Sequence, residues 1–197
     1  MKRIWTLIAF TLLGCSSKII SPPSEFSMAA HRAGFSFQGD SMFELIKEEA
    51  GGEERYRIQY FVGRLSDDLK IEVDSHRTAN ENETNRLMKE QISKLLSIYD
   101  PHRDPYFAIL TKNTSCPKEF QLEEVKNLKD SVKRSVFRGY TNERGTWGAC
   151  TPDLAKQKAY SVFFVCEDRF IKVDFRSSNN FSNSKIEEMI SSIQCFR

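Results

Sequence analysis

Two hairpin patterns, each followed by a helical pattern, organise the hydrophobic and polar positions of this chain. Residues 56–65 (YRIQYFVGRL) and 69–76 (LKIEVDSH) are rich in β-branched and aromatic residues, and the polar residues 66–68 between them are typical of a turn. Apolar residues then recur at helical spacing from Leu87 to Tyr99, after a polar stretch rich in capping residues. Asp100-Pro101 predicts the end of this helix, because a residue before proline resists the helical conformation.

The C-terminal part of the chain repeats this plan. Residues 160–166 (YSVFFVC) and 169–177 (RFIKVDFRS) predict two strands joined by a tight turn at Glu167-Asp168. Ser184 and Glu187 have the spacing of a helical capping box. The helix that follows has an apolar stripe formed by Ile186, Met189, Ile190 and Ile193.

The two units also share a short sequence match. Residues 71–74 (IEVD) and 171–174 (IKVD) fall at the same point of each unit, 100 residues apart. The match indicates either a weak internal repeat or the general likeness of any two units of this kind.

The middle of the chain predicts further short elements. Residues 106–112 predict a strand, apolar positions from Phe120 to Leu128 suit a short amphipathic helix, and residues 133–141 and 145–151 suit another hairpin. We therefore expect a single α+β domain. Its sheet would be mainly antiparallel, with about six to eight strands and two main helices packed on one face. An α/β/α sandwich is the alternative.

The N-terminus has the pattern of an export signal. Lys2 and Arg3 precede an apolar run from Ile4 to Leu13, which has 10 residues. A helix needs about 20 apolar residues to cross a bilayer, so this run is too short for a membrane span and suits a secretory signal. A buried N-terminal helix is the alternative interpretation.

The end of the apolar run carries a more specific motif. Leu12-Leu13-Gly14-Cys15 resembles the lipobox of bacterial lipoproteins. The resemblance implies that Cys15 receives a diacylglycerol group, that cleavage occurs before it, and that the new N-terminus is acylated, for example with palmitate. Ser16 follows the cysteine, which in the enteric pattern favours the outer membrane. A plain signal peptide with a leftover cysteine is the alternative.

This resemblance sets the expected domain boundaries. Residues 1–14 would be the signal peptide, residues 15–34 a lipidated N-terminus with a flexible tether, and residues 35–197 the globular domain. Removing Lys2 and Arg3 from the 29 basic residues leaves as many as the 27 acidic ones. Nucleic-acid binding, which usually requires a basic excess on one face, is therefore not expected.

Cysteine usage agrees with export. Besides Cys15 the chain contains Cys116, Cys150, Cys166 and Cys195, an even number, and export makes disulfides the default. Three pairings exist, and we favour Cys166–Cys195 with Cys116–Cys150. Cys166 ends a strand and Cys195 ends the last helix, which must pack back on the sheet. No C-x-x-C pair is present and the histidines are not closely spaced, so no metal site is expected.

One ligand site can be suggested. Trp147 lies between glycines in RGTWG, where its ring could form a platform for a sugar or a peptide, flanked by Arg138 and Tyr140. The same glycines could equally mark a turn beside a buried ring. Neither a nucleophile elbow nor a phosphate-binding glycine loop is present, so we expect neither catalytic residues nor a cofactor.

These observations favour a non-enzymatic protein, anchored by lipid in the bacterial cell envelope, whose domain binds a protein or a glycan. One alternative is a periplasmic or surface hydrolase with a site assembled from scattered residues. The other is an envelope-assembly factor that pairs its sheet edge with a partner strand.

Overall fold

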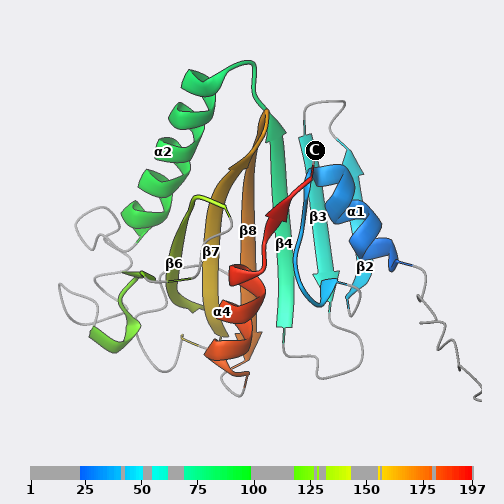
Figure 1. Cartoon of the computed structure of the whole chain (residues 1–197). Coiled ribbons are helices and arrows are strands. Elements are labelled where there is room, and N and C mark those ends of the chain that lie inside the picture. Colours follow the sequence, from blue (N-terminus) through cyan, green and yellow to red (C-terminus); the bar gives the residue numbers. More distant parts are fainter. Residues whose placement is uncertain are drawn as a thin grey trace, which may run out of the picture.

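A seven-stranded antiparallel sheet forms the middle layer of the fold, with the strand order β2-β3-β4-β8-β7-β6-β5 (Figure 1). The computed structural model describes residues 23–40, 43–50, 55–61, 69–98, 118–126, 128, 132–142, 155, 157–178 and 181–196. The helices in this part of the chain are α1 (Glu25–Ala33), α2 (Glu81–Ile98), the 3-10 helix η2 (Lys118–Phe120) and α4 (Asn183–Ser191). The strands of the sheet are β2 (Glu44–Ala50), β3 (Arg55–Phe61), β4 (Leu69–Arg77), β5 (Glu123–Glu124), β6 (Arg134–Thr141), β7 (Gln157–Cys166) and β8 (Arg169–Ser178).

The two predicted hairpins are confirmed, and they meet in the centre of the sheet. β3 pairs with β4 and β7 pairs with β8, while β4 and β8 lie side by side with Val73 opposite Val173. Along β4 the alternate residues Leu69, Ile71 and Val73 are buried, as the alternating pattern predicted. The α+β class and the predicted number of strands are therefore confirmed.

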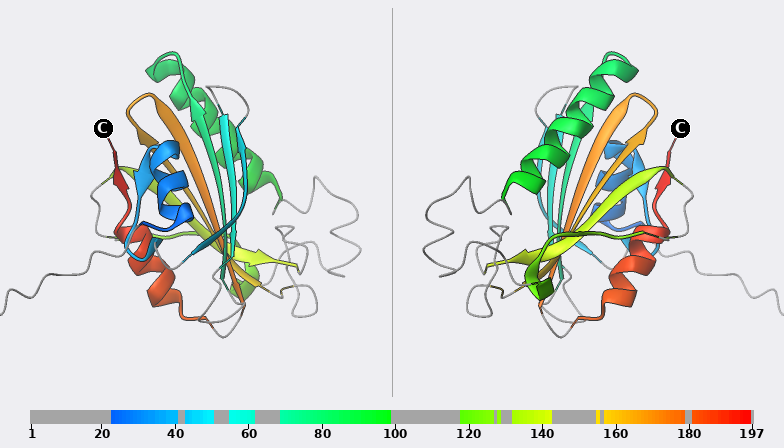
Figure 2. Two further views of the ribbon diagram at one scale, coloured as in Figure 1. Left: turned by 90° about the vertical axis from the view of Figure 1, so that its right-hand side faces the viewer. Right: turned by 90° about the vertical axis from the view of Figure 1, so that its left-hand side faces the viewer.

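The helices lie on both faces of the sheet, not on one face as predicted. Figure 2 shows α1 and α4 on one side and α2 on the other. On β7, Val162 and Phe164 pack in the core with α1 and α4, whereas Phe163 packs in a second core with Leu95 of α2. The physical reason is that β7 is apolar on both faces, so each face needs a helix to cover it.

The position of the helices also shows how much of the two units is alike in structure. The two hairpins are related by a local two-fold axis normal to the sheet at the Val73–Val173 pair. A rotation about such an axis keeps each side chain on its own face. Because α2 and α4 lie on opposite faces, the likeness covers the hairpins and does not extend to the helices.

The segment before residue 35 is not simply a tether. Residues 25–33 form α1, which begins at the N-cap Ser24, whose hydroxyl accepts a hydrogen bond of 3.1 Å from the Ser27 N–H. The helix ends at Gly34, whose φ of 99° is readily adopted only by glycine. The expected boundary at residue 35 is therefore wrong, since the fold begins by Ser24. Residues 1–22 lie outside the described part of the chain.

α1 is part of the main core. Its inward face consists of the fully buried residues Phe26, Ala29, Ala30 and Ala33. The Phe26 ring packs 5.5 Å from Phe37 and 5.0 Å from Phe43, measured between ring centroids. The small alanines let this helix approach the sheet closely, while Phe26 supplies the apolar volume.

Two further local predictions are wrong. The segment from Phe120 to Leu128 was expected to be helical, but it contains the end of η2 and the short strand β5. Its backbone pairs with β6 instead of with itself, as in the 2.8 Å hydrogen bond from the Val125 N–H to the Val136 carbonyl. Expected strands at 106–112 and 145–151 lie outside the described residues.

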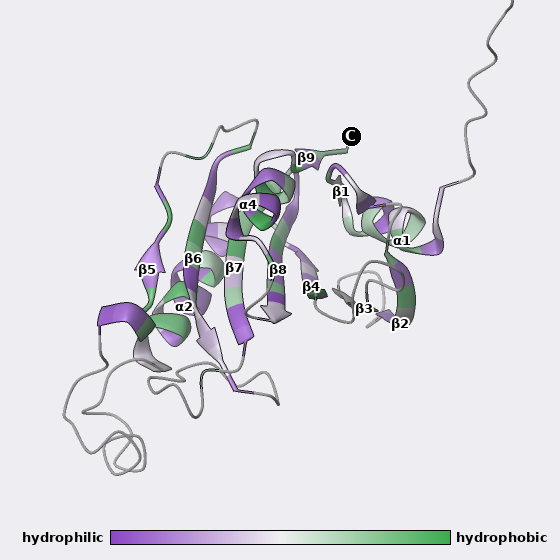
Figure 3. Ribbon diagram, turned by 90° about the horizontal axis from the view of Figure 1, so that it is seen from below, coloured by the Kyte–Doolittle hydropathy of each residue, from purple (hydrophilic) through white to green (hydrophobic). Residues whose placement is uncertain are grey.

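The second wrong prediction concerns the start of α4. Ser182, not Ser184, is the N-cap residue. Glu187 takes no part in a capping box because its carboxylate accepts a hydrogen bond from Tyr160 of β7. The predicted apolar stripe is correct: Ile186, Ile190 and Ile193 are fully buried, and Met189 packs against the same core. Figure 3 shows hydrophobic residues of α4 and hydrophobic segments along β6 and β8.

A disulfide joins Cys166 to Cys195, as predicted, with the two Cα atoms 5.2 Å apart. Cys195 lies in β9 (Gln194–Cys195), which pairs with β1 (Phe35–Ser36) in a two-stranded sheet. The bond therefore fixes the C-terminal strand to the end of β7. Cys116 and Cys150 lie outside the described residues, so their pairing stays a prediction.

Replacing both Cys166 and Cys195 with alanine should lower the free energy of unfolding by about 3–4 kcal/mol, because the bond closes a loop with a sequence separation of 29. Urea unfolding of the wild type and the double variant measures this difference. A reductant added to the double variant then reports separately on any bond between Cys116 and Cys150. Equal unfolding midpoints for wild type and double variant would contradict a stabilising role for the bond.

Candidate ligand-binding site

Two of the three residues predicted to form a ligand site lie on the wall of one cavity. Arg138 and Tyr140 are alternate residues of β6 and therefore point to the same face of the sheet, the face covered by α1 and α4. The cavity has a volume of about 280 Å³. Its walls are formed by Lys118, Glu119, Gln121, Glu123, Arg138, Gly139, Tyr140, Lys158 and Asn183. Trp147, the third predicted residue, lies outside the described part of the chain.

Arg138 joins three elements at the edge of this cavity. Its guanidinium forms an ion pair with Glu123 of β5 and another, at 3.3 Å, with Glu187 of α4. About a third of the Arg138 side chain, 34%, is exposed. Two carboxylates thus more than balance its single positive charge and hold it in place, so Arg138 fixes the geometry of the wall.

Tyr160 completes this network from the neighbouring strand. In the pairing of β6 with β7, Tyr160 lies directly opposite Arg138. Its side chain is fully buried and donates a hydrogen bond of 3.0 Å to Glu187 Oε1. Burial raises the pKa of Tyr160 to about 12; the Glu187 carboxylate acts in the same direction and Arg138 opposes it. Tyr160 is therefore a neutral phenol, and hence a hydrogen-bond donor, at any ordinary pH.

Tyr140 and two lysines also line the cavity. Phe120 and Tyr140 meet edge to face with ring centroids 5.2 Å apart. Lys158 lies directly across the strand pair from Tyr140, and Lys118 begins η2. Among the described residues neither of these ammonium groups has an ion-pair partner. The cavity therefore presents two lysine ammonium groups that form no ion pair in the described part of the chain, together with the Glu119 carboxylate, beside the Tyr140 ring.

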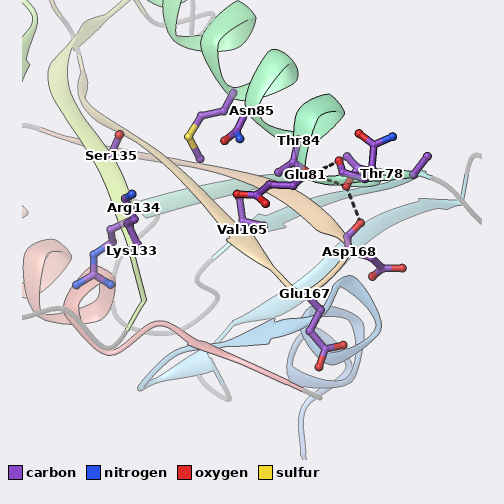
Figure 4. Close-up of a pocket in the computed structure, with 13 residues that line it drawn as sticks. Thr78, Glu81, Thr84, Asn85, Lys133, Arg134, Ser135, Val165, Glu167 and Asp168 are labelled. Atoms are coloured by element: carbon purple, nitrogen blue, oxygen red, sulfur yellow. Dashed lines mark hydrogen bonds between the residues drawn. The ribbon is translucent and has the colours of Figure 1, made fainter.

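A second and larger cavity lies on the other face of the sheet, between α2 and β6, with a volume of about 520 Å³ (Figure 4). Its walls are formed by Thr78, Ala79, Asn80, Glu81, Thr84, Asn85, Met88, Lys133, Arg134, Ser135, Val165, Glu167 and Asp168. This cavity could not be predicted from the sequence because its walls come from separate segments without a local motif. The only available signal was the polar stretch before α2.

That polar stretch is ordered by its own hydrogen bonds. Asn80 Oδ1 accepts a bond of 3.0 Å from the Glu83 N–H, and the Glu83 carboxylate accepts one of 2.7 Å from the Ala79 N–H. This reciprocal pair caps the start of α2. The Thr78 and Thr84 hydroxyls are 2.6 Å apart, and Thr78 Oγ1 also donates to the Asp168 carbonyl. The helix is thereby fixed to the β7–β8 turn.

The two described histidines, His31 and His76, line neither cavity. His31 stacks on Phe196 with ring centroids 3.9 Å apart, and His76 packs 6.5 Å from Phe170. His102 lies outside the described residues. Within the described ranges no group of three His, Cys, Asp or Glu side chains is arranged to hold a metal ion.

Comparison with known proteins gives no family for this chain. No protein-family model matches it, and no curated protein matches it. Among solved structures it is similar to a protein from Bacteroides thetaiotaomicron VPI-5482, with 10% sequence identity and a TM-score of 0.38. The match covers 83% of this chain and 48% of the other, so this chain spans about half the length of that protein.

Replacing Tyr160 with phenylalanine should lower the free energy of unfolding by about 1.5 kcal/mol at pH 8, because Glu187 loses a hydrogen-bond donor. The difference should shrink above pH 10. An unfolded tyrosine ionises near pH 10, whereas Tyr160 in the folded protein keeps its proton up to about 12. Ionisation in this window favours the unfolded state, so the wild type loses stability as pH rises.

Urea unfolding at pH 8, 10 and 11 measures this effect. The control is Tyr140→Phe, which replaces a half-buried tyrosine on the same face of the sheet as Tyr160. If the difference in unfolding free energy between wild type and Tyr160→Phe were the same at all three pH values, Tyr160 would have the same pKa in the folded and in the unfolded state.

Proposed function

We propose that this chain is a lipid-anchored protein of the bacterial cell envelope whose domain binds a small acidic glycan in the cavity of Arg138 and Tyr140. The observation that carries the binding role is the convergence of Lys118 and Lys158, which form no ion pair in the described part of the chain, on one cavity that the Tyr140 ring also lines. Ammonium groups would contact carboxylate or phosphate groups of the sugar. The rim of Tyr140 would contact its apolar face.

The fixed position of Arg138 supports the proposal that the cavity binds a ligand without a large rearrangement. Arg138 is held by Glu123 and Glu187, and Glu187 is held in turn by Tyr160. A wall fixed by ion pairs and hydrogen bonds needs little ordering when a ligand arrives, which favours affinity. Lys118 and Lys158, which form no ion pair among the described residues, are available to contact the ligand.

Two observations support export and anchoring. The Cys166–Cys195 disulfide suits an oxidising compartment, because the cytosol keeps thiols reduced. The Leu12–Cys15 motif supplies the acceptor cysteine for lipid. Each buried methylene contributes about 0.8 kcal/mol, so two or three acyl chains on one residue would hold the protein stably in the outer membrane.

No helix of the described segments has both the length and the apolar character needed to cross a membrane. The acyl chains on Cys15 are thus the membrane attachment that this proposal requires.

The anchor can be tested by expressing the full chain in a bacterial host supplied with an alkyne-tagged palmitate. We expect label on the wild type and none on Cys15→Ser, with the wild type recovered from membranes. Mass spectrometry of the mature N-terminus should place cleavage before Cys15. Equal labelling of both proteins, or cleavage at another bond, would refute the anchor while leaving the binding role open.

The binding role can be tested by calorimetric titration with a glucuronic acid oligosaccharide and with a neutral glucose oligosaccharide. We expect binding of the acidic probe only, weakened by salt. Replacing both Lys118 and Lys158 with glutamine should weaken it at least tenfold, since each contact to a charged group is worth about 1 kcal/mol or more. The matched control is Lys89→Gln with Lys94→Gln on the exposed face of α2. Equal losses of affinity in the two double variants would mean that binding depends on the net charge of the protein and not on the cavity.

A further inference from the structure

We infer that the cavity between α2 and β6 is a second, separate binding site, and that its ligand is a short peptide with free amino and carboxyl termini. This cavity lies on the α2 face of the sheet, opposite the face that carries Arg138 and Tyr140. The inference therefore does not depend on the proposed glycan site.

The size and floor of the cavity suit an organic ligand. Its volume of about 520 Å³ falls within the range of about 300–1,000 Å³ typical of small-molecule sites. Val165 of β7 and Met88 of α2 supply an apolar surface. A few polar side chains surround this surface, which is the usual composition of a site that orients a ligand.

The helix N-terminus is not the source of recognition. The Asn80 side chain and the Glu83 carboxylate already satisfy backbone N–H groups at the start of α2. A free anion would therefore find few open donors there, and it would meet the Glu81 carboxylate. Recognition must come from the side chains that line the cavity.

Those side chains include one acid and one base on opposite walls. Glu81 belongs to the first turn of α2, and Figure 4 shows its carboxylate extending over Val165. Lys133 directly precedes β6 on the other wall. Among the described residues neither group has an ion-pair partner.

The other charged residues of the walls are directed elsewhere. Arg134 donates a hydrogen bond of 2.5 Å to the Ile190 carbonyl at the end of α4. Asp168 pairs with Arg77 at 2.7 Å. The Glu167 and Asp168 carboxylates point away from Val165 in Figure 4. One negative and one positive group thus remain for a ligand.

This arrangement selects a zwitterion. A simple anion would be repelled by Glu81 and a simple cation by Lys133, whereas a molecule with an ammonium at one end and a carboxylate at the other would satisfy both. The Asn85 amide and the Ser135 hydroxyl also line the cavity and can donate and accept hydrogen bonds. A peptide backbone offers both kinds of partner, and its side chains would contact Val165 and Met88.

The test is calorimetric titration of the full mature protein, purified in detergent, with trialanine, N-acetyl-trialanine and trialanine amide. We expect trialanine to bind at least tenfold more tightly than either blocked form. Glu81→Gln should remove the preference for a free amino end and keep the preference for a free carboxyl end. Lys133→Gln should do the reverse. Glu188→Gln, an exposed carboxylate of α4 that does not line the cavity, is the matched control.

Both tested side chains are at the surface, so the variants should fold, and thermal unfolding of each variant verifies this. No binding of trialanine at millimolar concentration, or equal binding of free and blocked peptides, would overturn the inference. Loss of glycan binding in the Lys118 and Lys158 variant, with peptide binding unchanged, would show that the two sites are independent. Failure of the glycan test alone would leave the peptide site standing.

Discussion

Burial of β7 on both of its faces is the constraint that arranges the other layers. Val162 and Phe164 are fully buried under α1 and α4, and Phe163 is fully buried under α2. Burying a phenylalanine or a valine is worth about 1.5–3 kcal/mol each. A helix on only one side would leave half of this strand in water, so the fold has three layers although its sheet is antiparallel. β7 also carries Cys166, which holds the C-terminal strand β9.

The cavities follow from the same arrangement. β6 lies next to β7, and the helices cover the two strands only in part. On one face, α4 begins at Asn183 beside Arg138, and the first cavity lies there. On the other face, α2 begins at Glu81 across from Lys133, and the second cavity lies there. Each cavity thus lies where a helix begins, and the ion pairs, hydrogen bonds and caps at that point give it a fixed shape.

Features that depend on local sequence could be predicted. The hairpins follow from alternation and turn residues, α2 follows from its apolar periodicity, and the partner of Cys166 follows from the need of the last helix to pack on the sheet. α1 was missed because three of its four inward apolar residues are alanines, and a short alanine-containing stretch beside prolines resembles a linker.

Features that depend on distant partners could not be predicted in the same way. The periodicity from Phe120 to Leu128 fits a helix, but pairing with β6 overrides it. The side of the sheet that each helix covers was misjudged, although the continuous apolar run of β7 contained the signal for two-sided burial. Arg138 and Tyr140 could be placed together from the sequence because they are alternate residues of one strand, and both line one cavity. Glu81 and Lys133 are 52 residues apart, and only the fold brings them to one cavity.

The early start of α1 has a consequence for how far the domain can travel. Only eight residues separate Cys15 from the N-cap Ser24. A fully extended chain of this length spans at most about 30 Å. If Cys15 carries the proposed lipid, the domain stays within one such length of the headgroups and cannot reach across the envelope to a distant partner. Its search for ligands would then be two-dimensional, carried by diffusion of the anchor in the leaflet, and every ligand would have to come to the membrane surface to be bound.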